Sequence, residues 1–131
     1  MKRNRTKLTI AVLLALVLVM TVSVMPASAG GKTIVVQKFM RANTGGVLRA
    51  AGITLVVPPN ALPYNALVTM KINRDQREVE FSPDMNFARP VYVHFAFPVN
   101  GLNFWTGTRW EPVQMVGRTA ILNHFSRYAW W

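Results

Sequence analysis

The chain has 131 residues, of which 51% are apolar and 15% are charged. This is the length of a single domain, and so apolar a composition excludes an intrinsically disordered protein. Fifteen basic residues against five acidic ones give a net charge of +10, and the absence of cysteine excludes disulfide bonds, thiolate zinc sites, cysteine nucleophiles and a lipid-modified cysteine anchor.

The N-terminal segment has the three parts of a secretory signal peptide. Four basic residues lie within positions 1–7, and residues 8–25 are almost wholly apolar. The small residues of Ala27-Ser28-Ala29 follow, and they form the A-x-A pattern that signal peptidase recognises.

We therefore predict a signal peptide over residues 1–29, cleaved between Ala29 and Gly30. The alternative is an uncleaved membrane anchor, because residues 8–25 as a helix would span about 27 Å, close to the thickness of a bilayer core. In both cases the rest of the chain is expected outside the cell, freely secreted in the first case and membrane-anchored in the second.

Removal of the signal peptide changes the charge of the chain. Residues 30–131 keep 11 basic and five acidic residues, a net charge of +6. Small secreted eukaryotic domains more often carry disulfide bonds, so a cysteine-free exported chain favours a bacterial source.

The mature segment shows strand patterns throughout and no helical periodicity. Short alternating runs are separated by Gly, Pro and Asn, which is typical of strands joined by turns. The clearest run is 91–97, where Val91, Val93, Phe95 and Phe97 share one face and Tyr92, His94 and Ala96 share the other. The runs that show this pattern are 34–39, 47–49, 53–57, 67–72, 78–81, 91–97, 104–105 with 109–110, 113–116, 119–122 and 126–131. This pattern predicts an all-β fold, an antiparallel β-sandwich of about eight short strands after an N-terminal signal helix.

Several blocks of the mature segment together resemble a ZU5 domain, in particular the ZU5-like domains of exported bacterial proteins. The glycine pair and strand start of 45–48 precede a strand and a Pro-Pro turn at 52–62. The connection at 81–91 resembles the F-x-P to F-x-x-P link of that family, and the blocks 110–113 and 124–128 follow in the same order. Residues 30–131 are therefore predicted to form one ZU5-like domain.

The resemblance implies a β-sandwich used as an interaction or structural module. ZU5 domains bind partner proteins or pack against neighbouring domains, and no particular partner carries over to this chain. Asn60 stands where the family has Gly in the Pro-Pro turn, a mild change because Asn adopts left-handed backbone angles more readily than other non-glycine residues.

The sequence His124-Phe125-Ser126 is similar to the H-F-S sequence at which some ZU5-containing death-domain adaptors, and an unrelated nucleoporin domain, cut themselves. There the Ser hydroxyl attacks the preceding carbonyl, an N-to-O acyl shift gives an ester, and water hydrolyses it. The resemblance implies His124 as base, Phe125 as acyl donor and Ser126 as nucleophile. The alternative is structural: Phe125 fills the core, Ser126 hydrogen-bonds a turn and His124 lies at a strand edge. We expect the structural role, and a chain that is not an enzyme.

Four tryptophans form the second set of candidate site residues: Trp105, Trp110, Trp130 and Trp131. Exposed aromatic side chains on a β-sandwich stack on sugar rings, and the positive charge favours anionic wall polymers. Trp130 and Trp131 are adjacent, and adjacent strand residues point to opposite faces, so both are not expected to be buried. The alternative function is therefore a cell-wall or carbohydrate-binding module, beside a protein-interaction or envelope-structure module.

Other ligand classes are not expected. Asp75, Glu78, Glu80 and Asp84 cluster in the sequence, but arginines interleave with them, which favours a solvated charged face over a calcium site. Two histidines 30 residues apart make no zinc site. Basic residues are spread along the chain and do not concentrate as nucleic-acid binding requires, so we predict no metal, no cofactor and no nucleic acid.

Overall fold

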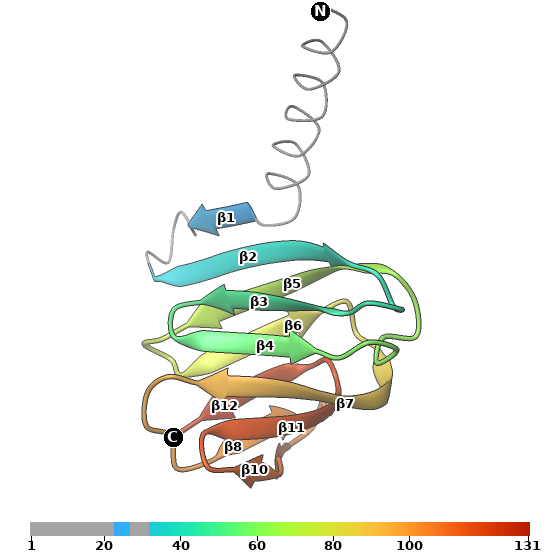
Figure 1. Ribbon diagram of the computed structural model, residues 1–131. Coiled ribbons are helices and arrows are strands. Elements are labelled where there is room, and N and C mark those ends of the chain that lie inside the picture. Colours follow the sequence, from blue (N-terminus) through green and yellow to red (C-terminus); the bar gives the residue numbers. More distant parts are fainter. Residues whose placement is uncertain (1–22, 27–31) are drawn as a thin grey trace, which may run out of the picture.

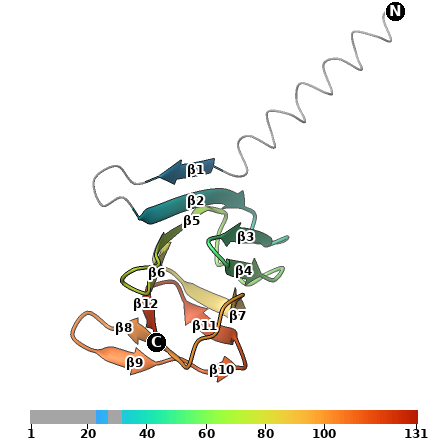
Figure 2. The ribbon, with the colours of Figure 1, turned by 90° about the vertical axis from the view of Figure 1, so that its left-hand side faces the viewer.

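The computed structural model describes residues 23–26 and 32–131, and within them the protein is a two-layer β-sandwich (Figure 1). All paired strands are antiparallel. Figure 2 shows the two layers side by side, with β5, β6, β12 and β8 on one side and β3, β4, β7 and β11 on the other. The described chain holds no helix long and apolar enough to cross a membrane. The all-β sandwich predicted from the alternating runs is confirmed, while the predicted signal helix up to residue 22 and the cleavage position lie outside the described residues.

The first layer is a sheet of seven of the described strands. In order across the sheet they are β1 (Ser23–Pro26), β2 (Thr33–Met40), β5 (Ala66–Asn73), β6 (Glu78–Ser82), β12 (Arg127–Trp130), β8 (Leu102–Trp105) and β9 (Trp110–Pro112). Strand β1 comes from the segment predicted as signal peptide, and it pairs with β2 at the edge of this sheet.

The second layer is a sheet of five of the described strands. In order they are β10 (Met115–Val116), β11 (Thr119–His124), β7 (Asn86–Phe95), β4 (Ile53–Val57) and β3 (Gly46–Ala50). Strand β7 begins five residues earlier than the alternation predicts and contains Pro90. The ladder between β11 and β7 shifts register between Leu122 and His124, so that Pro90 lies in an irregularity where a missing N–H is tolerated.

The core is formed by the alternate residues of each strand that point between the layers. In β7 these are Val91, Val93 and Phe95, all fully buried, as the alternation predicts. The residues between them point outward, and His94 is exposed, with its Nδ1 3.1 Å from the Thr119 hydroxyl.

Two tight turns depend on left-handed backbone angles. Asn60 has φ +64°, the conformation that its place in the Pro-Pro turn requires, and its N–H donates to the Ala42 carbonyl at 2.7 Å. Gly45 has φ +66°, and a Cβ at this position would collide with the Val57 carbonyl oxygen. Glycine is therefore required at position 45 by space as well as by φ.

Candidate ligand-binding surface

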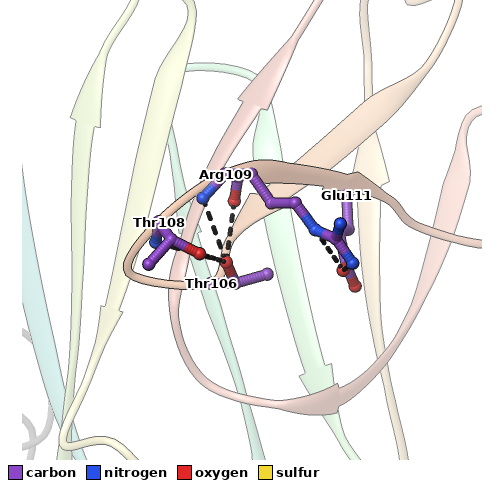
Figure 3. A network of polar contacts seen from close by, with 4 residues as sticks. All are labelled: Thr106, Thr108, Arg109 and Glu111. Atoms are coloured by element: carbon purple, nitrogen blue, oxygen red, sulfur yellow. Dashed lines mark hydrogen bonds and ion pairs between the residues drawn. The ribbon is translucent and has the colours of Figure 1, made fainter.

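The hairpin of β8 and β9 carries two of the four candidate tryptophans. Thr106 organises its turn (Figure 3): the Thr106 hydroxyl accepts hydrogen bonds from the Arg109 and Thr108 backbone N–H groups at 3.1 and 3.3 Å. Beyond the turn, Arg109 Nε and Nη2 donate to Glu111 Oε1 at 2.9 and 2.7 Å. The predicted turn at 106–108 is confirmed, and these contacts hold the two strands in register at the hairpin tip.

Trp105 and Trp110 face each other across this hairpin as a cross-strand pair. Their ring centroids are 5.3 Å apart with the planes inclined at 58°. The Arg127 guanidinium lies over the Trp110 ring, 5.5 Å from its centroid, within the range of a cation–π contact. Trp110 is 37% exposed. The pair therefore presents an aromatic surface to solvent, held in place by a neighbouring cation.

Arg127 is fixed from two sides on the outer face of the sheet. Its Nη2 donates to Glu78 Oε1 at 2.8 Å, and this hydrogen bond, with the nearby charges of Glu78 and Glu80, raises the pKa of Arg127. Arg127 lies beside Glu80 in the β12–β6 pairing. The charged guanidinium of Arg127 thus lies between the carboxylates of Glu78 and Glu80 and the Trp110 indole ring.

Two hollows lie next to this group and share Glu80 and Arg127. One, of about 350 Å³, is also bordered by Trp105, Thr106 and Asp84. The other, of about 250 Å³, extends along the sheet past Lys71. Together they give the aromatic pair a rim of hydrogen-bond donors and acceptors.

Trp131 reaches the same face at the other end of β8. Its ring occupies the space where a side chain at Gly101 would lie, since a Cβ there would collide with the indole. Leu102 is buried in the core, so the neighbouring position 101 faces outward. Trp131 is 49% exposed and lies four strand positions, about 13 Å, from Trp105. We call the surface carrying Trp105, Trp110, Arg127 and Trp131 the tryptophan face.

Trp130 does not belong to this face. It is 7% exposed and packs between Phe95 and Phe97, with ring centroids 5.7 and 5.5 Å away. Strand alternation turns Trp130 into the core and Trp131 outward, as expected of adjacent strand residues.

The residues of the H-F-S sequence occupy three different environments. Phe125 is buried and stacks on Phe81 with centroids 5.4 Å apart. The Ser126 hydroxyl donates to the Trp105 carbonyl at 3.2 Å, which links the residue before β12 to the end of β8. His124 Nδ1 lies 3.4 Å from the Phe125 carbonyl oxygen. The histidine is thus placed at the carbonyl that would be attacked, while the serine proton is held by Trp105.

Tyr128 forms a tyrosine corner of the kind found in Greek-key sandwiches. Its ring is fully buried, and its hydroxyl donates to the His124 carbonyl at 2.5 Å. Burial raises the pKa of this hydroxyl. Tyr128 is therefore a structural residue that fixes the approach to β12.

Sequence reasoning missed Arg127, Glu78 and Glu80 as part of the tryptophan face. The signal was present locally, because alternation places Glu78 and Glu80 on one face of β6 and buries Val79 and Phe81. Arg127 joins them through the pairing of β12 with β6, a contact between segments about 50 residues apart in sequence. Among the described residues, no group of three His, Asp or Glu side chains is arranged to hold a metal ion.

Comparison of the chain with protein-family models, with curated proteins and with solved structures gave no significant match.

Proposed function

We propose that this chain is an exported, non-enzymatic, ZU5-like binding module of the cell envelope that holds a polysaccharide chain on the tryptophan face. The observation that carries the proposal is the contact pair of Trp105 and Trp110, solvent-facing and bordered by a polar hollow. Such a pair combines an apolar ring surface with hydrogen-bonding groups at its edge. Sugars present the same combination, since their rings have apolar C–H faces and hydroxyl edges.

The arrangement of the tryptophan face favours an extended ligand over a single sugar. Trp105 and Trp131 lie about 13 Å apart along β8, a length that several linked sugar rings span. The residues between them on this face, Asn103 and Ala129, have small side chains and pair with each other. A polymer bound along β8 and β12 therefore contacts an indole near each end and small side chains between them.

Substitution of Trp110 tests the proposal. Trp110→Ala removes a half-exposed ring at the sheet edge, so it is expected to leave the fold intact while weakening retention on purified cell-wall polysaccharide. A central aromatic contact contributes about 2 kcal/mol to binding, which corresponds to a dissociation constant raised about 30-fold. The measurement is depletion of the full-length chain by insoluble wall polysaccharide at increasing polymer concentration.

Tyr92→Ala is the matched control, because Tyr92 is also 37% exposed but lies on the outer face of the other sheet. This variant is expected to bind the polymer as the wild-type chain does. Equal retention of the wild-type chain and Trp110→Ala would contradict the proposal.

A second function, docking to a protein, is favoured by a different observation. Val47, Val56, Tyr92 and Ile121 form one cross-strand row on the outer face of the five-stranded sheet. A continuous apolar row open to solvent is a feature of protein-interaction surfaces. If this row carries the function, Tyr92→Ala reduces retention of the chain on cell envelopes and Trp110→Ala does not. Protease treatment of the envelopes then abolishes retention of the wild-type chain.

A further inference from the structure

A third pocket is bordered by residues of the β5–β6 turn and by the C-terminal residue. Figure 1 shows this turn and the C-terminus at the same end of the sandwich. The pocket encloses about 410 Å³ and is bordered by Arg74, Arg77, Phe97, Asn100 and Trp131. We call it the arginine pocket. It is within the size range of small-molecule sites, and it adjoins the outer end of the tryptophan face through Trp131.

The arginine pocket is bordered by two guanidinium groups, those of Arg74 and Arg77, and by the main-chain carboxyl group of Trp131, whose oxygen accepts a hydrogen bond from the Asn100 N–H at 2.6 Å. None of the described side chains that border it is acidic. The acidic residues on the same turn and strand are engaged elsewhere: Asp75 pairs with Lys32 at 3.2 Å, and Glu78 pairs with Arg127 at 2.8 Å. In the described part of the chain, neither Arg74 nor Arg77 forms an ion pair.

Arg74 is held rigidly at the wall of the pocket. Its guanidinium carbon lies 3.8 Å from the centre of the Phe97 ring, and its Nη1 donates to the Ala51 carbonyl at 2.8 Å. Stacking and one hydrogen bond fix the plane of the guanidinium and use one of its five N–H donors. The remaining donors are oriented in advance for an acceptor.

Arg77 has a left-handed backbone conformation, which residues other than glycine and asparagine rarely adopt. It has φ +56°, in the turn where its N–H donates to the Arg74 carbonyl at 3.3 Å. Gly or Asn adopts this conformation with less strain. Strained backbone at a non-glycine residue is found at ligand-binding positions, where the side chain serves a purpose other than stability.

We propose that the arginine pocket binds an anionic group, phosphate or carboxylate, attached to a sugar that stacks on Trp131. Guanidinium groups bind both of these anions through paired N–H donors, and Asn100 adds an amide at the rim. The inference rests on the proposed function, and it adds that the bound wall polysaccharide carries anionic groups. The pocket itself is tested without the polymer.

The test is an NMR titration of the full-length chain with glucose 6-phosphate, glucuronate and glucose. Both anionic sugars are expected to shift the Trp131 indole N–H and the Arg77 Nε–H signals in a saturable way, and glucose to bind at least tenfold more weakly. Tighter binding of glucose 6-phosphate assigns the natural group as phosphate, and tighter binding of glucuronate assigns it as carboxylate. Equal shifts with glucose, or no shift of these signals with either anion, would overturn the proposal.

Arg77→Asn separates binding from folding. It relieves the left-handed strain, so its melting temperature is expected to equal or exceed that of the wild-type chain, while its affinity for the anionic sugars falls at least tenfold. Arg49→Asn makes the same change at an exposed arginine of the five-stranded sheet and is expected to bind as the wild-type chain does. Unchanged affinity in Arg77→Asn would refute the role of the pocket.

The failure of one proposal is distinguishable from the failure of the other. Trp110→Ala is expected to weaken polymer retention and leave the titration with small anions unchanged. If no polysaccharide retains the wild-type chain, the proposed function fails, and the titration still decides whether the arginine pocket binds anions.

Discussion

Removal of one buried hydroxyl group, in Tyr128→Phe, tests the account of how β12 is held. The Tyr128 hydroxyl donates to the His124 carbonyl, and the ring packs against Phe81 with centroids 5.9 Å apart. Phenylalanine keeps the ring and deletes only the donor, so the His124 carbonyl loses a partner in a part-buried site. A buried polar group left without its partner costs about 1–3 kcal/mol in the free energy of unfolding.

The assay is urea denaturation followed by tryptophan fluorescence at pH 7. For a domain of this size, each 1 kcal/mol also lowers the melting temperature by about 4–8 °C. The dependence of the free energy of unfolding on urea is expected to be unchanged, because the variant exposes the same surface on unfolding.

The same hydroxyl predicts a dependence on pH with a defined sign. Burial raises the pKa of Tyr128 above its ordinary value of 10.0. Below pH 10 the hydroxyl is protonated in both the folded and the unfolded chain, and its full contribution to stability is present. Above pH 10 the unfolded chain loses this proton while the folded chain keeps it, so the free energy of unfolding falls by up to about 1.4 kcal/mol per pH unit.

Tyr128→Phe lacks this ionisation, so the stability difference between the wild-type chain and the variant should narrow as the pH rises above 10. The reasoning is refuted if the two proteins unfold at the same urea concentration at pH 7. It is refuted equally if their difference is constant from pH 7 to above pH 10.

Three further predictions concern turns and processing. Gly45→Ala is expected to destabilise the fold by about 3 kcal/mol or more in the same urea assay, because its Cβ meets the Val57 carbonyl at a left-handed φ; a loss below about 1 kcal/mol would contradict this. Ala51→Asn should instead raise the free energy of unfolding by about 1 kcal/mol, since Ala51 has φ +51° in a two-residue hairpin turn that favours Asn-Gly; equal or lower stability would count against that turn assignment. Mass spectrometry of the expressed protein under denaturing conditions is expected to show a chain beginning at Gly30 with residues 126–131 retained, because the Ser126 hydroxyl donates to a carbonyl and not to a base. A species lacking residues 126–131, absent from Ser126→Ala, would make self-processing the function.

Much of the fold follows from patterns that are local in the sequence. The alternation of 91–97 predicts the inward set Val91, Val93 and Phe95, because successive strand residues point to opposite faces whichever strands lie beside them. The same rule separates Trp130 from Trp131. The left-handed turn at Asn60 is likewise local, since it depends on one residue's conformational preference and its proline neighbours.

The candidate site follows these patterns only in part. Trp105 and Trp110 can be identified from the sequence because a short hairpin turn separates them, so that each lies beside the other. The partners of Trp110 cannot be identified in that way. Arg127 and Glu78 are separated by 49 residues and meet because β12 lies between β6 and β8.

The sequence by itself determined the all-β class, the turns and the face on which each strand residue lies, because these depend on contacts between near neighbours in the chain. The tertiary structure alone decided which strands pair and which loops meet at the ends of the sandwich. Pairing depends on how two sheets bury their apolar faces together, and many strand orders satisfy the same alternation. For this reason the arginine pocket, built from the turn at Arg74 and Arg77 and from Trp131 more than 50 residues later, has no signal in the sequence.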